Sequence, residues 1–296
     1  MSELVWSTQL SPMRNQPTSK LKGCTLAVSL LALAFNATAG TAPTIQECAT
    51  CSITDAAVSA VNGKIDFHYG SVNDTYTRGV GGALSLPVGK SFGVQIDGLY
   101  AHAAESDIYG YGAHFFTRRP SKGLLGLAAG GLTSTDFNDF VVGLEGEYYL
   151  DKITLGAFVG YNNFDSHFAN PKLGGRLANE TNFVAARLYA AIYPIDDLVI
   201  RIGYENRFER NFYTAHLEYQ TPIAGLALFA DGALGDASFY SLVGGVRYYF
   251  GAKKSLKARH RQDDPQSLPG SNLATSIAGG QGGSAAPAAT REVPPT

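Results

Sequence analysis

The sequence predicts an all-β protein whose strands form one closed, antiparallel transmembrane β-barrel. Between residues 63 and 250, apolar and polar residues alternate with the two-residue period of a β-strand. The chain contains 34 Gly, 16 Tyr and 16 Phe but only 16% charged residues, a composition that favours many short strands over helices. Strands that turn one face to lipid and the other to polar groups are typical of barrels that stand in a membrane.

Residues 1–39 predict a cleaved secretory signal peptide. The apolar stretch from Cys24 to Phe35 follows the basic residues Lys20 and Lys22, and the small residues Ala37 and Ala39 flank a typical cleavage position. The stretch is too short to cross a bilayer, which requires about 20 apolar residues. We therefore expect cleavage after Ala39.

Residues 40–62 predict a polar periplasmic leader that contains Cys48 and Cys51, the two cysteines left after cleavage. Export places them in an oxidising compartment, which favours a local disulfide between them. A redox pair is the alternative. A c-type haem site would require a histidine at the position of Ser52.

The two-residue period from Gly63 onward predicts about twelve strands, within a range of about 10 to 14. The expected strands span residues 63–70, 79–87, 91–102, 107–117, 123–132, 137–150, 152–162, 182–193, 197–206, 212–221, 225–232 and 238–250. An even number of strands brings both ends of the barrel to the same side of the membrane, and we expect that side to be the periplasm.

The connections between these strands are expected to alternate in length, as they do in bacterial outer-membrane barrels. Tight, turn-forming sequences lie at residues 87–90, 151–152, 194–197 and 222–225. Longer connections lie between them, at residues 71–78, 163–181, 207–211 and 233–237. The connections at 117–122 and 133–136 depart from the alternation. We expect the short turns in the periplasm and the longer loops outside.

Aromatic residues predict two girdles around an aliphatic band. One set falls near the loop ends of the strands, at Tyr69, Tyr100, Tyr109, Tyr161, Tyr204, Tyr213 and Tyr240. The other set falls near the turn ends, at Phe115, Tyr148, Tyr219, Tyr248 and Phe250. Amphipathic rings of this kind favour the two headgroup layers of a membrane.

Residues 63–250 resemble the porin-like family of bacterial outer-membrane β-barrels, and the sequence from Val246 to Phe250 carries the likeness. Tyr248 and Phe250 are similar to the terminal aromatic signal that the barrel-assembly machinery recognises in that family. The resemblance implies a location in the Gram-negative outer membrane, in contact with its lipid and lipopolysaccharide. The family signal normally ends the protein, whereas here residues 251–296 follow it.

Residues 251–296 predict a disordered periplasmic tail. The segment opens with basic residues between Lys253 and Arg261 and then becomes rich in Gly, Ala, Ser and Pro. We expect either a solvated linker or a basic contact with peptidoglycan.

Along each strand, the residues that alternate with the apolar, lipid-facing ones predict a polar lumen. Its charged lining is expected to comprise Asp66, Asp97, Glu145, Glu147, Arg187, Arg201, Glu205, Glu218, Asp231 and Arg247. Two interpretations compete: the arginines pair with the carboxylates and fill a narrow interior, or surplus carboxylates line a water-filled path and favour cations. Inward glycines such as Gly110 and Gly112 leave space beside the charged groups.

The expected function is passive diffusion of small polar solutes through a mixed, acid-rich lumen, without cofactor, metal or covalent chemistry. The alternative is a structural or adhesive barrel with a plugged interior and partner-binding outer loops, of which residues 163–181 are the best candidate. The net charge of −2 argues against a nucleic-acid partner.

Two sequence patterns resemble enzyme sites but lack the setting that such sites require. Gly89 to Gly93 match the Gly-x-Ser-x-Gly pattern, but a turn here leads into a strand, whereas a nucleophile elbow leads into a helix. His102, Glu105 and Asp107 share an outer loop, where such groups are usually solvated. We therefore expect no enzymatic activity.

Overall fold

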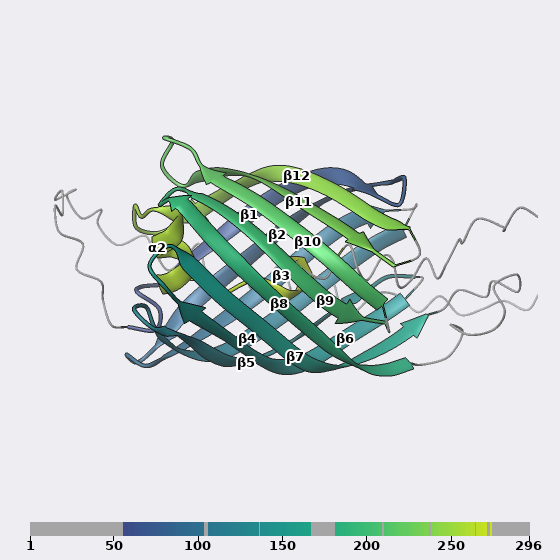
Figure 1. Ribbon diagram of the computed structural model, residues 1–296, viewed down its shortest axis with the longest axis horizontal. Helices are drawn as coiled ribbons and strands as arrows, with labels where there is room; N and C mark the ends of the chain where they lie inside the picture. Colours follow the sequence, from purple (N-terminus) through teal and green to yellow (C-terminus); the bar gives the residue numbers. More distant parts are fainter. Residues whose placement is uncertain are drawn as a thin grey trace, which may run out of the picture. The chain divides into compact units, whose positions relative to one another are not determined.

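The computed structural model describes residues 56–103, 106–135, 137–166, 181–208, 210–236, 238–263, 265–270 and 273. Twelve antiparallel strands form a closed barrel in which each strand pairs with the next and β12 pairs with β1 (Figure 1). The fold class and strand number predicted from the sequence are therefore confirmed. The expected signal peptide and the Cys48–Cys51 disulfide lie outside the described residues.

The strands lie close to the ranges that the residue pattern predicts. They are β1 (Asn62–Val72), β2 (Thr75–Val88), β3 (Phe92–Ala103), β4 (Ser106–Arg119), β5 (Gly123–Thr133), β6 (Phe137–Tyr149), β7 (Ile153–Ser166), β8 (Thr181–Ile195), β9 (Leu198–Arg207), β10 (Arg210–Gln220), β11 (Leu226–Gly235) and β12 (Phe239–Phe250). The register is shifted between Ile192 and Ile195, where Pro194 cannot donate a backbone hydrogen bond to the ladder.

The outer surface of the barrel is apolar, and β12 illustrates the alternation. Leu242 exposes 64% of its surface outside the barrel, whereas the neighbouring Ser241 exposes 7%. Val246, Tyr248 and Phe250 follow the exposed parity. The closed sheet pairs the backbone groups along each strand, so the apolar surface can stand in hydrocarbon without unpaired edges. The protein is thus an outer-membrane barrel, and its outward residues meet lipid.

The connections at the loop end of the barrel are shorter than the sequence suggests. Asn73 and Asp74 both adopt positive φ angles, of 47° and 62°, and form a two-residue turn between β1 and β2. The long loop expected at residues 71–78 is therefore wrong. Phe208 and Ser238, with φ angles of 57° and 60°, likewise stand at short connections. Residues 167–180 of the expected long loop lie outside the described residues.

The turn end of the barrel carries the connections β2–β3, β4–β5, β6–β7, β8–β9 and β10–β11. The β4–β5 connection, which the sequence made an exception to the alternation of lengths, is compact. The strand β4 extends to Arg119, and Lys122 N donates to Arg119 O at 2.8 Å. The expected long turn at residues 117–122 is therefore also wrong. The tight turns at this end agree with the sequence pattern.

The chain after β12 differs most from expectation. The helix α2 (Leu256–Gln262) begins after Ser255, whose hydroxyl accepts a hydrogen bond from Ala258 N. The disorder predicted from residue 251 onward is therefore wrong for the described part of the tail. Figure 1 shows α2 at the turn end of the barrel. No helix within the described residues is long and apolar enough to cross a membrane.

Candidate functional site

The inside of the barrel forms the candidate site, and it encloses a cavity of about 180 Å³. Eight of the ten charged residues predicted for the lumen line this cavity: Asp66, Glu147, Arg187, Arg201, Glu205, Glu218, Asp231 and Arg247. The other two, Asp97 and Glu145, face inward on the wall beside the cavity, where both contact His114. The two-residue period of the strands accounts for this placement.

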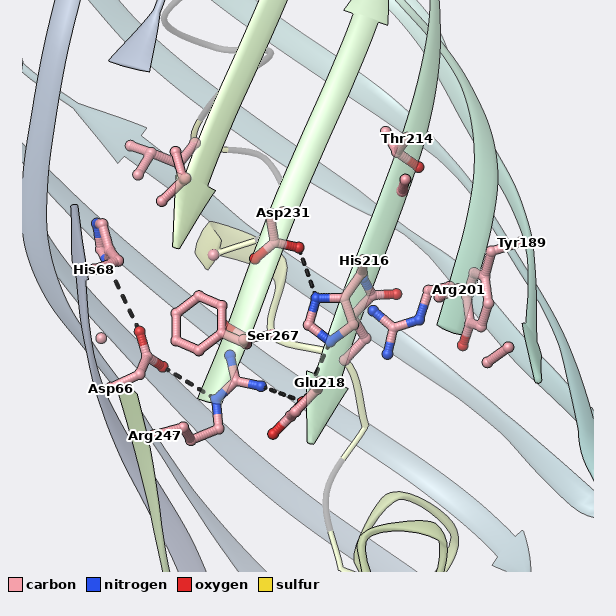
Figure 2. Close-up of a pocket in the computed structure, with 18 of the residues that line it drawn as sticks. Asp66, His68, Tyr189, Arg201, Thr214, His216, Glu218, Asp231, Arg247 and Ser267 are labelled. Carbon is pink, nitrogen blue, oxygen red and sulfur yellow. Dashed lines mark hydrogen bonds and ion pairs between the residues drawn. The ribbon is translucent and has the colours of Figure 1, made fainter. Parts of the chain in front are cut away.

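The first charged cluster joins β1, β10, β11 and β12 (Figure 2). Arg247 donates a 2.7 Å hydrogen bond to Glu218, and its Nε lies 3.6 Å from an oxygen of Asp66. His216 lies 2.7 Å from Asp231 and 3.2 Å from Glu218. Direct cross-strand pairing explains two of these contacts, because Asp66 is opposite Arg247 and His216 is opposite Asp231.

The second cluster is buried between β3, β4 and β6. His114 contacts Asp97 through Nε2 at 2.9 Å and Glu145 through Nδ1 at 2.9 Å. Gln95 donates to the other oxygen of Asp97 at 2.7 Å and accepts from Ser85 at 2.9 Å. These polar side chains therefore satisfy one another, and Gln95 is fully buried.

The third cluster lies nearer the loop end. Arg207 pairs with Asp139 and donates to Asn162 at 2.8 Å, while Arg187 lies 3.3 Å from Glu205. Arg207 and Asp139 are not among the lumen residues predicted from the sequence. Arg207 falls just after the predicted strand 197–206, in an expected loop, whereas Asp139 lies within the predicted strand 137–150. Arg201 and Glu205 face inward at alternating positions of β9, and the same alternation two residues further along the strand predicts that Arg207 faces inward.

Arg201 differs from the other arginines of the cavity. Its guanidinium lies 5.3 Å from the centre of the Tyr189 ring. Among the described residues, no carboxylate lies within ion-pair distance of it, and its buried Nε has no hydrogen-bond partner. Figure 2 shows Arg201 beside His216 and Tyr189. The cavity thus contains one positive charge that no carboxylate of the described chain neutralises at close range.

The lumen also contains part of the tail, described at residues 265–270 and 273, which we call the lumenal segment. Gln95 donates to Pro265 O, and Leu268 N donates to Asp97, both at 3.3 Å. Leu268 packs with Ala128 and other buried wall residues, and Leu273 packs in a cluster toward the loop end. This placement differs from the disordered tail that the composition predicts, and Leu268 and Leu273 in an otherwise polar tail are the sequence signal for it.

The helix α2 is fixed to the turn end of the barrel by several polar contacts, which we call the latch. Lys257 lies 2.6 Å from Asp196, and its backbone N–H donates to Asp196 O at 2.9 Å. Arg259 donates to Gln220 at 2.9 Å, and Arg261 donates to Ile153 O at 3.0 Å. Three basic residues of the tail are thus engaged with the barrel itself.

The remaining sequence candidates lie outside the lumen. The rings of Tyr248 and Phe250 meet edge to face on the lipid face near the turn end, with centroids 5.2 Å apart, and their role as an assembly signal stays a prediction. His102 lies 2.9 Å from Asp107 on the exposed loop end, while Glu105 lies outside the described residues. Within the described ranges, no group of His, Cys, Asp or Glu is arranged to hold a metal ion.

Comparison with known proteins finds neither a matching family model nor a matching curated protein. Among solved structures, the chain is similar to the KdgM porin, with 12% identity, coverage of 64% of this chain and 99% of that one, and a TM-score of 0.48. The KdgM porin in complex with disordered oligogalacturonate gives the same identity and coverage, with a TM-score of 0.49. The NanC porin gives 10% identity, 64% and 99% coverage, and a TM-score of 0.45.

Proposed function

We propose that the barrel lets small polar solutes diffuse across the outer membrane through its lumen. The observation that carries the proposal is the width of the interior. Its wall is polar, and the side chains of the barrel do not fill the space that the wall encloses. About eight strands enclose just enough room for side chains, and this barrel has twelve. The additional room holds the lumenal segment and still leaves a cavity of about 180 Å³.

Passage would be hydrated diffusion without a covalent step. The cavity has room for several water molecules, and the hydroxyl, carboxylate and guanidinium groups of its wall can replace part of a solute's hydration shell. A wall of this kind favours small hydrophilic solutes over apolar ones. Gly81 stands at an inward position and Gly82 and Gly98 at outward positions, and these three residues without side chains keep the wall thin beside the charged groups.

Charge selectivity would be weak. Arg247, Arg187 and Arg207 each lie beside a carboxylate, so much of the charge is neutralised within the wall. Arg201 adds an unneutralised positive charge to a lumen that also holds surplus carboxylates. We therefore propose a mixed lumen that gives cations only a small preference.

A structural barrel with a filled interior is the second candidate, and the lumenal segment is the observation that favours it. In that case the lumen would hold its own chain permanently, and the outer surface would carry the function. The two candidates differ in a single measurable property, the ionic current through the folded protein.

Planar-bilayer recording of the purified, refolded protein tests the proposal. Discrete current steps are expected, and they should appear only in samples that show heat-modifiable migration, which reports a folded barrel. A folded sample that gives no steps over long recordings, in both salt and voltage series, would favour the structural barrel instead.

A further inference from the structure

We infer that the described part of the tail, residues 251–263, 265–270 and 273, acts as a built-in plug, held in the lumen by the latch, and that releasing the latch opens the path. The inference rests on the proposed passage of solutes and adds its control. The inference concerns only the contacts of residues that follow β12 in the sequence.

The wall of the lumen is shaped around the lumenal segment. A Cβ atom added at Gly110 would lie 2.8 Å from Cβ of Pro269, and one added at Gly112 would lie 3.0 Å from Cδ of Pro269. Both distances are shorter than ordinary carbon contacts, so larger residues on this part of β4 would displace the segment. The small residues of this part of β4 thus leave room for Pro269 as well as for neighbouring wall residues such as Leu132 and Asp97.

The lumenal segment itself is held by long hydrogen bonds and by apolar contacts. Two hydrogen bonds to the wall, with Gln95 and Asp97, measure 3.3 Å and are at the long end of the usual range. Leu268 and Leu273 add apolar contacts with buried wall residues. Residues 268–270 and 273 are helical, and a short segment held by contacts of this kind can leave a hydrated lumen without disturbing the strands.

The latch supplies stronger contacts at the turn end. Lys257 pairs with Asp196, and Leu256 N donates to Asp197 at 3.1 Å. Arg259 reaches Gln220, and Arg261 reaches the turn between β6 and β7. Charge-assisted hydrogen bonds are roughly twice as strong as neutral ones. The segment is therefore held chiefly where α2 meets the periplasmic turns.

A glycine connects the latch to the barrel. Gly251 follows directly after β12 and has a φ angle of +94°, a conformation that other residues rarely adopt. This conformation turns the chain away from the wall and allows α2 to lie at the turn end (Figure 1). The plug is therefore joined to a rigid wall through one conformationally permissive residue.

A disulfide across the latch tests the inference in the full chain. Asp196→Cys with Lys257→Cys joins residues that already share a backbone hydrogen bond of 2.9 Å, and disulfides bridge Cα atoms about 4.4 to 6.8 Å apart. Cys24, Cys48 and Cys51 are replaced by serine in this protein. The oxidised form should be silent in planar bilayers.

Reduction removes the disulfide and leaves the latch without its Lys257–Asp196 ion pair. The open probability of the reduced form should exceed that of the unmodified protein by about tenfold, equivalent to about 1.4 kcal/mol. Lys253→Ala is the matched control, because Lys253 is an exposed basic residue of the same tail. It should leave the open probability unchanged.

The outcomes separate the two proposals. Equal currents from fully oxidised and fully reduced protein would overturn the plug and leave the proposed passage standing. A second variant carries Arg259→Ala and Arg261→Ala in addition to the two cysteines. If neither the oxidised nor the reduced form conducts although the barrel is folded, and the disulfide re-forms more slowly in this second variant, the proposed passage is overturned and release of the latch stands. No current together with unchanged disulfide formation would overturn both.

Discussion

Asp66 and Arg247 face each other across the seam at which β1 meets β12, with Arg247 Nε 3.6 Å from an oxygen of Asp66. The same guanidinium donates to Glu218 on β10 and lies 4.6 Å from the centre of the Phe229 ring on β11. One side chain therefore joins the four strands that close the barrel. The charge network of the lumen and the closure of the sheet depend on the same residue.

Replacing Arg247 with methionine should destabilise the barrel by about 2 kcal/mol, because hydrogen bonds to charged groups contribute about 1.5 to 3 kcal/mol. Glu218 would lose the cation at 2.7 Å while remaining fully buried. Urea unfolding in lipid vesicles, followed by tyrosine fluorescence and gel migration, measures the change. Adding Glu218→Gln to the same protein should recover part of the loss, and an unchanged unfolding midpoint for Arg247→Met would contradict this account of the seam.

Replacing Leu242 or Val246 with lysine should block insertion into lipid. Both side chains are exposed on the outer surface of β12, and a lysine at the middle of a membrane costs about 2 to 4 kcal/mol. Val243→Lys is the matched control, because Val243 is adjacent to Leu242 on the same strand and lines the cavity. The measurement is heat-modifiable migration after refolding into vesicles. Equal folding of all three variants would show that the two faces are assigned wrongly.

Replacing Arg201 with glutamine should shift the selectivity of the open channel toward cations. Arg201 contributes a positive charge that no carboxylate of the described chain neutralises at ion-pair distance, so its removal changes the net charge that a solute meets. Reversal potentials in a salt gradient measure the shift. Replacing Arg187 and Glu205 together by glutamine removes one charge of each sign and should leave the reversal potential near its original value. A larger shift from the double variant than from Arg201→Gln would count against the assigned role of Arg201.

Replacing Gly251 with alanine should loosen the plug without weakening the barrel. The φ angle of +94° becomes strained for a residue with a Cβ, and the added atom would lie 3.3 Å from Cβ of Asn62. We expect a higher open probability in planar bilayers with an unchanged urea midpoint. Gly244→Ala tests whether any glycine replacement on this part of the chain has the same effect, because Gly244 has ordinary strand geometry. A rise in open probability that is as large for Gly244→Ala would contradict the role of Gly251.

The strands and their faces could be predicted because the two-residue period is a local signal. On β12, the alternation of Ser241, Leu242, Arg247 and Tyr248 in the sequence is the alternation of inward and outward positions in the barrel. Inward charges follow from the same parity, so the lumen residues could be named without knowing which strands are neighbours. Their pairing could not be named, since His114 meets Glu145 across two strand interfaces.

The short turns at the loop end of the barrel were less predictable. Asn73 and Asp74 were assigned to a loop because their polarity breaks the strand pattern, but both tolerate the positive φ angles of a two-residue turn. The residues on either side of them then continue the strands in register, from Val72 opposite Thr75 onward. A polar break in a strand pattern therefore indicates a turn but not its length.

The tail could not be predicted from its composition. Glycine, alanine, serine and proline cannot bury a core of their own, which is why residues 251–296 indicated disorder. For the described part of the tail, the interior of the barrel supplies the missing surface, and Leu268 and Pro269 contact that wall. Whether a weakly apolar segment is ordered thus depends on a cavity that only the complete fold creates.

One recording tests the central claim most directly: the current through a single refolded Asp196→Cys, Lys257→Cys protein while reductant is added to the bath. The account predicts a silent membrane before reduction and discrete current steps within the same trace afterwards. A trace that conducts from the start with the disulfide intact, or that stays silent after complete reduction, would contradict a lumen opened by release of its own tail.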